Sequence, residues 1–254
     1  MIAERIDVHH AEARPPIPKE PQMTQPAGLH HVAISTSNMK AQIEFFSDVL
    51  GMELVALYWM HGAKGCWHGF MRMIDDSCVA FVFAPGNENL APQIGVTHAG
   101  HGAGASAPGT MQHLALNVAT MADLLNMRDR IRSRGVNVIG PLDHGICQSM
   151  YFAGPENLTL EIATSDGASA PLDLDRTWID PEVVALAGIS AEELARYTRP
   201  EKYAGENGSL PQPPYDPAKP HTSGPVDRYK ATLAIPDDVF KARFSETTPP
   251  HPHA

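Results

Sequence analysis

The stretch HVAISTSNM, from His31 to Met39, returns further along the chain as HLALNVATM, from His113 to Met121. After each histidine, apolar residues alternate with small or polar ones, which is typical of a strand with one buried face. A helical pattern then follows each methionine. The chain therefore contains an internal repeat, and each copy is predicted to begin as a strand followed by a helix.

Both predicted helices carry the expected end signals. The first begins after Ser37 or Asn38 and the second after Thr120, because these side chains cap helix N-termini. Gly51 and Gly135 fit the left-handed position that ends a helix. Three strand-like runs follow each helix, so each copy is a βαβββ unit, and two units predict an α+β fold with a cupped mixed sheet and helices outside it. The runs are 53–59, 66–73 and 78–83 in the first copy, and 136–139, 148–152 and 158–163 in the second.

Prolines mark the two ends of the chain, since five of the 23 fall in residues 1–26 and thirteen fall after residue 164. In the C-terminal part, Ser190 and Glu193 form a capping-box pattern, which predicts one short helix near 181–198. We expect an extended N-terminal arm over 1–27, a domain over 28–164 made of units 28–84 and 112–164 with a linker loop over 85–111, and a Pro-rich extension over 165–254.

The composition excludes several classes of protein. With 19 Lys and Arg against 29 Asp and Glu, the net charge of -10 repels phosphate, so neither nucleic acid nor an anionic lipid surface is an expected partner. No run approaches the roughly 18 apolar residues of a membrane span, and the N-terminus has no apolar signal core. The scattered Cys66, Cys78 and Cys147 indicate reduced thiols. We therefore expect a cytoplasmic protein.

Side chains alternate between the two faces of a strand, and this alternation puts the residues that could bind a metal or transfer a proton on one face of the predicted sheet. His31, His113, Tyr151 and Glu161 share faces that otherwise carry small residues, which leaves room for a cavity. Two imidazoles and a carboxylate form the set that holds a divalent metal and leaves positions open for substrate or O2. Ordinary core polar residues are the alternative, but the recurrence of the histidine in the repeat favours a metal. The position equivalent to Glu161 in the first unit falls near Val79, where Cys78 is the one alternative ligand, so we expect three ligands and not four.

The chain resembles the vicinal oxygen chelate superfamily, which contains glyoxalases, bleomycin-resistance proteins and type I extradiol dioxygenases. The resemblance covers residues 28–164 and neither arm. It implies that His31, His113 and Glu161 are the metal ligands, and that His30 is not one. The stretches that carry it are Gly28–Met39, Phe45–Gly51, Met111–Leu116 and Ser149–Glu161.

The position of Tyr151 favours the dioxygenase branch of this superfamily. In type I extradiol enzymes a tyrosine stands ten residues before the ligand glutamate and its hydroxyl touches the substrate; Tyr151 has that spacing from Glu161. We therefore expect a metal-dependent oxidoreductase, an extradiol-type ring-cleaving dioxygenase that acts with O2 on a catechol-like or hydroquinone-like aromatic. The resemblance implies Fe(II), with Mn(II), Zn(II) or Ni(II) as alternatives.

Two departures from that branch affect the choice of the other site residues. The dioxygenases usually carry an acid/base histidine where this chain has Asp76-Ser77-Cys78-Val79, and many have an extra pair of units. His144 is the expected replacement for that histidine, since imidazole titrates near neutral pH. We expect the substrate to contact His98, His101, Asp143 and Ser149, although a solvated loop is the alternative for the first two.

Two other functions stay open at this point. A glyoxalase-, epimerase- or thiol-transferase-like enzyme would use a divalent ion as a Lewis acid without O2. A non-catalytic binding protein is disfavoured, because such relatives lack the ligand set. In each case the partner is a small molecule, and since members of the superfamily often pair, we expect a homodimer.

Overall fold

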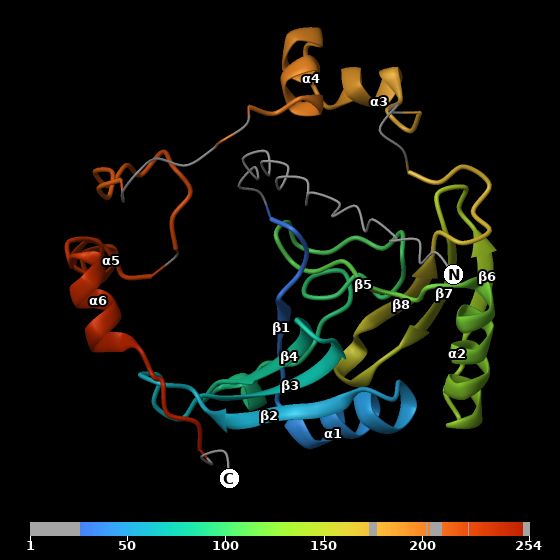
Figure 1. Ribbon diagram of the computed structural model, residues 1–254, viewed down its shortest axis with the longest axis horizontal. Helices are drawn as coiled ribbons and strands as arrows, with labels where there is room; N and C mark the ends of the chain where they lie inside the picture. The colour runs from blue at the N-terminus through green and yellow to red at the C-terminus, as the bar shows by residue number, and fades with distance from the viewer. Residues whose placement is uncertain (1–25, 173–176, 202, 204–209, 223, 251–254) are drawn as a thin grey trace, which may run out of the picture.

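The structure is a computed structural model, and it describes residues 26–172, 177–201, 203, 210–222 and 224–250 (Figure 1). The extended arm expected over 1–27 lies outside the described residues, apart from its last two. Within these ranges, no helix combines the length and the apolar character needed to cross a bilayer. All three cysteines are free thiols, as predicted.

The first unit is a strand, a helix and three further strands, as predicted. Its sheet has the order β1-β4-β3-β2, in which β1 runs parallel to β4 and the other neighbours are antiparallel. Helix α1 passes directly into a π-helical segment, η1. The elements are β1 (His31–Ser35), α1 (Met39–Glu44), η1 (Phe45–Val49), β2 (Glu53–Trp59), β3 (Trp67–Ile74) and β4 (Ser77–Phe83).

The second unit repeats this arrangement, since its sheet has the order β5-β8-β7-β6 with β5 parallel to β8. The linker between the units contains only a 3-10 turn, η2 (Asn87–Asn89), and one isolated bridge between Ile94 and His98. The elements of the unit are β5 (Leu114–Asn117), α2 (Met121–Ser133), β6 (Ile139–Asp143), β7 (Gln148–Ala153), the 3-10 turn η3 (Pro155–Asn157) and β8 (Thr159–Thr164).

The predicted helix ends are confirmed. The side chain of Asn38 accepts a hydrogen bond from the backbone N–H of Ala41 at the start of α1. Thr120 begins α2 with a complete capping box to Asp123. Gly51 and Gly135 have φ values of 80° and 78°, a conformation that glycine adopts without the steric cost other residues meet.

The prediction for the sixth strand is wrong, because the strand spans Ile139–Asp143 and not 136–139. Proline lacks a backbone N–H, so Pro141 argues against a strand at this place in the sequence. The strand tolerates it because β6 lies at the sheet edge, where the register shifts between Ile139 and Leu142. A bulged edge strand needs no N–H from that residue.

The α+β class with helices outside the sheets is confirmed, and the strands form two four-stranded mixed sheets. The two units share one apolar core on their helical side. Phe45 of η1 stacks on Phe152 of β7 with ring centroids 6.4 Å apart. Arg130 of α2 donates to the backbone oxygen of Val49 at 2.9 Å, which caps the end of η1 with a cation. The units are thus joined by their helices and apolar sheet faces.

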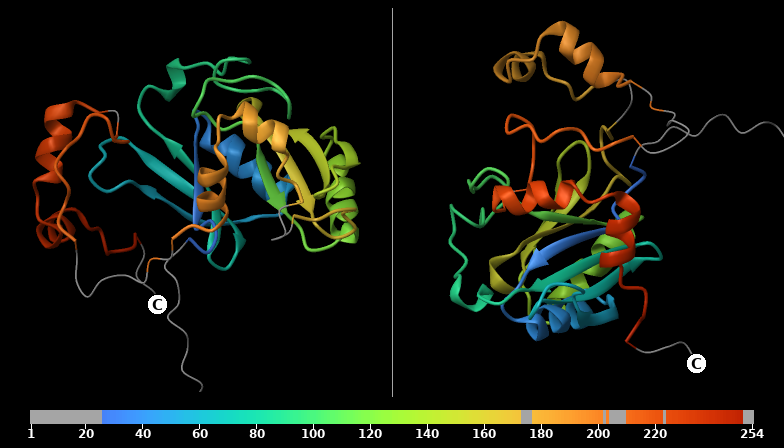
Figure 2. Two further views of the ribbon diagram at one scale, coloured as in Figure 1. Left: turned by 90° about the horizontal axis from the view of Figure 1, so that it is seen from above. Right: turned by 90° about the vertical axis from the view of Figure 1, so that its left-hand side faces the viewer.

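The C-terminal extension contains more helix than the single one predicted near 181–198. Among the residues of the extension that the structure describes, two helices lie in that region and two follow, and none of these four helices buries a residue. Helices α3 and α4 stand away from the sheets in Figure 1 and in the right view of Figure 2. Further on, Glu246 returns to the first unit, where its carboxylate lies 3.1 Å from His61 Nδ1. The helices are α3 (Pro181–Leu186), α4 (Ala191–Thr198), α5 (Val226–Leu233) and α6 (Asp237–Phe244).

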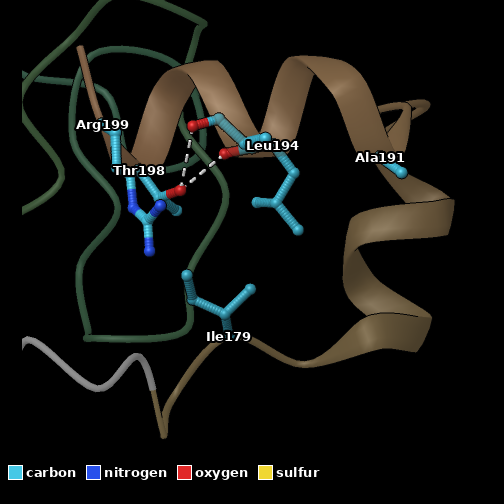
Figure 3. Close-up of a pocket in the computed structure, with 6 residues that line it drawn as sticks. Ile179, Ala191, Leu194, Thr198 and Arg199 are labelled. Carbon is cyan, nitrogen blue, oxygen red and sulfur yellow. Dashed lines mark hydrogen bonds between the residues drawn. The ribbon is translucent and has the colours of Figure 1, made fainter.

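The extension has a cavity of its own, of about 460 Å³, beside α4 (Figure 3). Ile179 and Leu194 supply apolar walls, and the hydroxyl of Thr198 donates to the backbone oxygen of Leu194 at 2.9 Å. None of the predicted site residues lines this cavity.

Candidate metal centre

The second sheet places Glu161 at its centre. Strand β8 lies between β5 and β7, and Glu161 is opposite Ala115 on one side and Tyr151 on the other. Its side chain is only 6% exposed. A buried carboxylate is costly unless a positive partner or hydrogen-bond donors compensate it. This carboxylate is therefore suited to meet a cation.

His113 provides the donor atom nearest to that carboxylate. It directly precedes β5, and its Nε2 lies 2.9 Å from Oε2 of Glu161. On the other side of the ring, Nδ1 contacts the amide oxygen of Gln112, so that Nε2 is the ring nitrogen that faces Glu161. Gln112 also donates to the backbone oxygens of His101 and Gly102 at 3.0 and 2.8 Å. Sequence reasoning missed Gln112, because nothing in its spacing distinguishes it from any residue beside a histidine.

Tyr151 and His144 lie next to this pair. The Tyr151 hydroxyl lies 3.0 Å from His144 Nε2, and its ring centroid is 6.3 Å from that of His113. Burial and the nearby Glu161 carboxylate raise the pKa of Tyr151 above its ordinary value of 10.0. The phenol therefore stays protonated at neutral pH and can donate a hydrogen bond.

The four predicted substrate contacts lie in different places. His101 lines a cavity beside Tyr151, and the buried Ser149 has its hydroxyl 3.2 Å from the Cys147 sulfur. Asp143 accepts a hydrogen bond from the backbone N–H of Gly145 at 2.7 Å, so it shapes the turn that carries His144. His98 lines a separate cavity. The structure thus places His101, but not His98, next to Tyr151.

The cavity beside Tyr151 has a volume of about 450 Å³. The linker closes part of it, and a Cβ added at Gly102 would lie 3.8 Å from the Tyr151 ring. A space of this size accommodates a small aromatic molecule. Its walls are Ile94, Gly100, His101, Gly102, Asn137, Ile139, Tyr151, Phe152, Ala153, Asn157, Leu158 and Thr159.

The third predicted ligand, His31, lies on the other sheet. Its Nδ1 is 2.9 Å from that of His30, and its ring centroid is 5.5 Å from that of Phe70 on β3. In the part of the chain that the structure describes, no three His, Cys, Asp or Glu side chains gather closely enough to hold a metal ion. The structure therefore brings together His113 and Glu161, but not His31.

His68 is a further polar residue of the first sheet. Its ring contacts those of Tyr58 and Phe70, with centroids 4.3 and 4.8 Å away. Burial, and then the charge of His31, lower its pKa below 6.5. Nε2 of His68 is buried and has no hydrogen-bond partner among the described residues. The polar face of the first sheet is thus lined by aromatic rings around His31 and His68.

Two curated dioxygenases are similar in sequence to this chain. Biphenyl-2,3-diol 1,2-dioxygenase 2 of Rhodococcus globerulus is 28% identical over 58% of this chain and 70% of its own length. Biphenyl-2,3-diol 1,2-dioxygenase 3 of the same organism is 21% identical over 68% of this chain and 82% of its own.

Solved structures of the same kind match with low scores. A glyoxylase/bleomycin resistance protein/dioxygenase domain from Frankia sp. EAN1pec is 13% identical, with a TM-score of 0.44 over 55% of this chain and 98% of that one. Lactoylglutathione lyase from Agrobacterium tumefaciens is 16% identical, with a TM-score of 0.40 over 56% and 96%. A family model matches residues 28–167, more than half of the chain. The chain therefore belongs to the Glyoxalase/Bleomycin resistance protein/Dioxygenase superfamily.

Proposed function

We propose that the chain is a metal-dependent, extradiol-type dioxygenase that cleaves the ring of a catechol-like or hydroquinone-like aromatic with O2. The observation that carries the proposal is the group formed by His113, Glu161, Tyr151 and His144 on one sheet face. The similarity to two biphenyl-2,3-diol dioxygenases favours ring cleavage over the other reactions of the superfamily.

The donor atoms fit a divalent metal. His113 Nε2 and Glu161 Oε2 converge at 2.9 Å, and an imidazole with a carboxylate is the ligand chemistry that Fe(II) accepts. His113 and Glu161 would hold Fe(II), with Mn(II), Zn(II) or Ni(II) as alternatives. The resemblance implies His31 as the third ligand, and in this structure His31 lies on the other sheet. When bound, such an ion supplies Lewis acidity toward adjacent substrate oxygens and a place for O2.

The residues around the ligands can hold the substrate and move its protons. Tyr151, protonated because its pKa is raised, donates a hydrogen bond to a substrate oxygen. His144 accepts a proton through that hydroxyl, since its Nε2 already lies within hydrogen-bond distance. The cavity beside Tyr151 holds the rest of the molecule, where His101 contacts it. Ser149 and Asp143 support the strand and the turn from which Tyr151 and His144 project.

The test measures bound metal and O2 uptake on the same preparation. The protein is purified without chelator under anaerobic conditions, its metal is determined, and O2 uptake is recorded with catechol and with biphenyl-2,3-diol. We expect iron and O2 uptake with one of these diols. His113→Ala is expected to lose both while keeping its circular dichroism spectrum. A protein that carries metal but takes up no O2 with either diol would contradict ring cleavage.

A further inference from the structure

The linker between the units forms one wall of the cavity beside Tyr151 with a short loop, residues 99–104, which we call the cavity loop. Its residues 100–102 line the cavity, and a Cβ added at Gly102 would lie 3.8 Å from the Tyr151 ring. The position of this loop therefore decides how much room a substrate has next to the phenol.

Contacts within the cavity loop hold its backbone in one shape. The N–H of Gly104 donates to the backbone oxygen of His101 at 2.9 Å. A Cβ at Gly104 would lie 2.0 Å from the backbone oxygen of Ala99, so the chain passes close to itself here and only glycine fits. In this shape the backbone oxygens of His101 and Gly102 both accept hydrogen bonds from one side chain, that of Gln112.

The amide of Gln112 joins the cavity loop to His113. Its Nε2 donates to the two loop oxygens at 3.0 and 2.8 Å, and its Oε1 contacts His113 Nδ1. Carbonyl oxygens only accept hydrogen bonds, so the amide nitrogen must face the loop and the amide oxygen must face the ring. His113 Nδ1 therefore carries the proton of this contact, while Nε2 faces Glu161 at 2.9 Å.

The first unit has a contact at the equivalent place, but a less specific one. His30 precedes His31 as Gln112 precedes His113, and the Nδ1 atoms of His30 and His31 lie 2.9 Å apart. An imidazole nitrogen donates in one tautomer and accepts in the other, so this pair does not fix which ring carries the proton. In the second unit the neighbouring side chain assigns the proton and also reaches the cavity loop.

We infer that Gln112 is a positioning residue that couples the cavity loop to His113, because the loop oxygens orient the amide and the amide orients the ring. The inference rests on the proposed function, since it concerns the same ligand and the same cavity. The ring, once fixed by a bound cation, would hold the loop in place through Gln112. Metal binding should therefore slow hydrogen exchange in the loop.

Zinc affinity and hydrogen exchange measure the two ends of the amide separately. Zn(II) is titrated into metal-free protein, and exchange is followed in peptides that cover the cavity loop, with and without the metal. In the wild type we expect zinc to slow this exchange. Gln112→Met keeps a similar length but has no amide, so its zinc affinity should fall about 10- to 100-fold, the usual cost of losing the partner of a ligand histidine. Its loop should exchange faster than that of the wild type, and zinc should not slow it.

Gln112→Glu separates the two contacts. Its carboxylate can still accept from His113 Nδ1 but cannot donate to the loop oxygens, so we expect a zinc affinity close to that of the wild type and a loop that exchanges as fast as in Gln112→Met. Gln148→Met is the matched control and should behave as the wild type. The Gln148 amide donates to the backbone oxygen of Gly167 at 3.1 Å, and Gln148 does not line the cavity.

The outcomes distinguish this inference from the proposed function. Wild-type zinc affinity in Gln112→Met, or equal losses of affinity in both Gln112 variants, would overturn the inference. So would a wild-type protein that binds zinc without any change in loop exchange. If Gln112→Met did not fold, as judged by circular dichroism, loop exchange in Gln112→Glu with and without zinc would decide. A wild-type protein that binds no divalent metal would instead refute the proposed function.

Discussion

At the residue scale, the chemistry centres on Tyr151, whose hydroxyl lies between a carboxylate and an imidazole. The raised pKa of Tyr151 keeps its phenol protonated, and His144 Nε2, which lies 3.0 Å from the hydroxyl, can accept the proton. A group of this kind contributes in the transition state more than in substrate binding. Its removal should therefore act on turnover.

Tyr151→Phe is expected to lower kcat by about 10²- to 10³-fold with little change in KM, since proton transfer by one positioned side chain contributes about that much. The metal content should not change, because the phenol is not a ligand. The measurement is O2 uptake against substrate concentration on protein with determined iron. Tyr197→Phe, an exposed position on α4, is the matched control. An unchanged kcat would exclude Tyr151 from the proton transfer.

The sequence alone indicated Tyr151 and Glu161, because these two residues lie on neighbouring strands that are close together in the chain. Tyr151 and Glu161 face each other across a short connection between antiparallel strands, so a fixed spacing of ten determines their pairing. His31 is different. Parity predicted its face correctly, but the partners across that face depend on packing between units, which no local spacing encodes.

At the scale of single elements, helix ends were the most predictable features. Ser190 has a complete capping box to Glu193 on α4, as Thr120 has to Asp123 on α2. A helix cap depends only on residues that are neighbours in the sequence, so the sequence pattern is enough to predict it. The predicted bounds of β6 were wrong because a strand accepts Pro141 only at the edge of a sheet. The position of a strand in the sheet is a property of the tertiary structure, which the local sequence does not contain.

The two capping boxes should differ in their effect on stability. Thr120→Ala is expected to lower the free energy of unfolding by about 1 kcal/mol, because α2 buries Leu124 and Ile131 in the shared core. Ser190→Ala should leave the cooperative unfolding transition unchanged, since α4 buries no residue and frays on its own. Urea denaturation followed by fluorescence compares them. Equal losses would mean that the extension unfolds together with the core.

At the scale of the whole molecule, what matters is how the two units are joined. Hydrophobic patterning predicted which face of each sheet is buried, but it does not say whether the units pack by their helices or by their polar faces. Long-range contacts decide this. One of them is Glu156 in the turn η3, which binds residues from the first unit more than a hundred positions earlier in the chain.

Glu156 should make the joint between the units sensitive to acid. Its carboxylate accepts hydrogen bonds from Thr36 Oγ1 at 2.6 Å, from the backbone N–H of Ser37 at 2.8 Å and from Gln42 Nε2 at 2.8 Å. Partial burial opposes the charged form, but these donors outweigh it and lower the pKa of Glu156 below 4.5. A lowered pKa adds stability that is complete above the unfolded value of 4.5 and is lost as the pH falls through the folded value.

Glu156→Gln is therefore expected to cost about 2 kcal/mol at pH 7, because an amide cannot accept from all these donors and a hydrogen bond to a charged group contributes about that much. The difference from wild type should shrink as the pH falls through the lowered pKa of Glu156, because the wild-type carboxylate then takes up a proton. Thermal unfolding between pH 3 and pH 7 measures it. Glu193→Gln removes a carboxylate whose pKa is also lowered, by Ser190, but from the exposed helix α4, so its unfolding should follow the wild type at every pH. If the Glu156 variant lost the same stability at pH 3 as at pH 7, the carboxylate charge would not be what holds the units together.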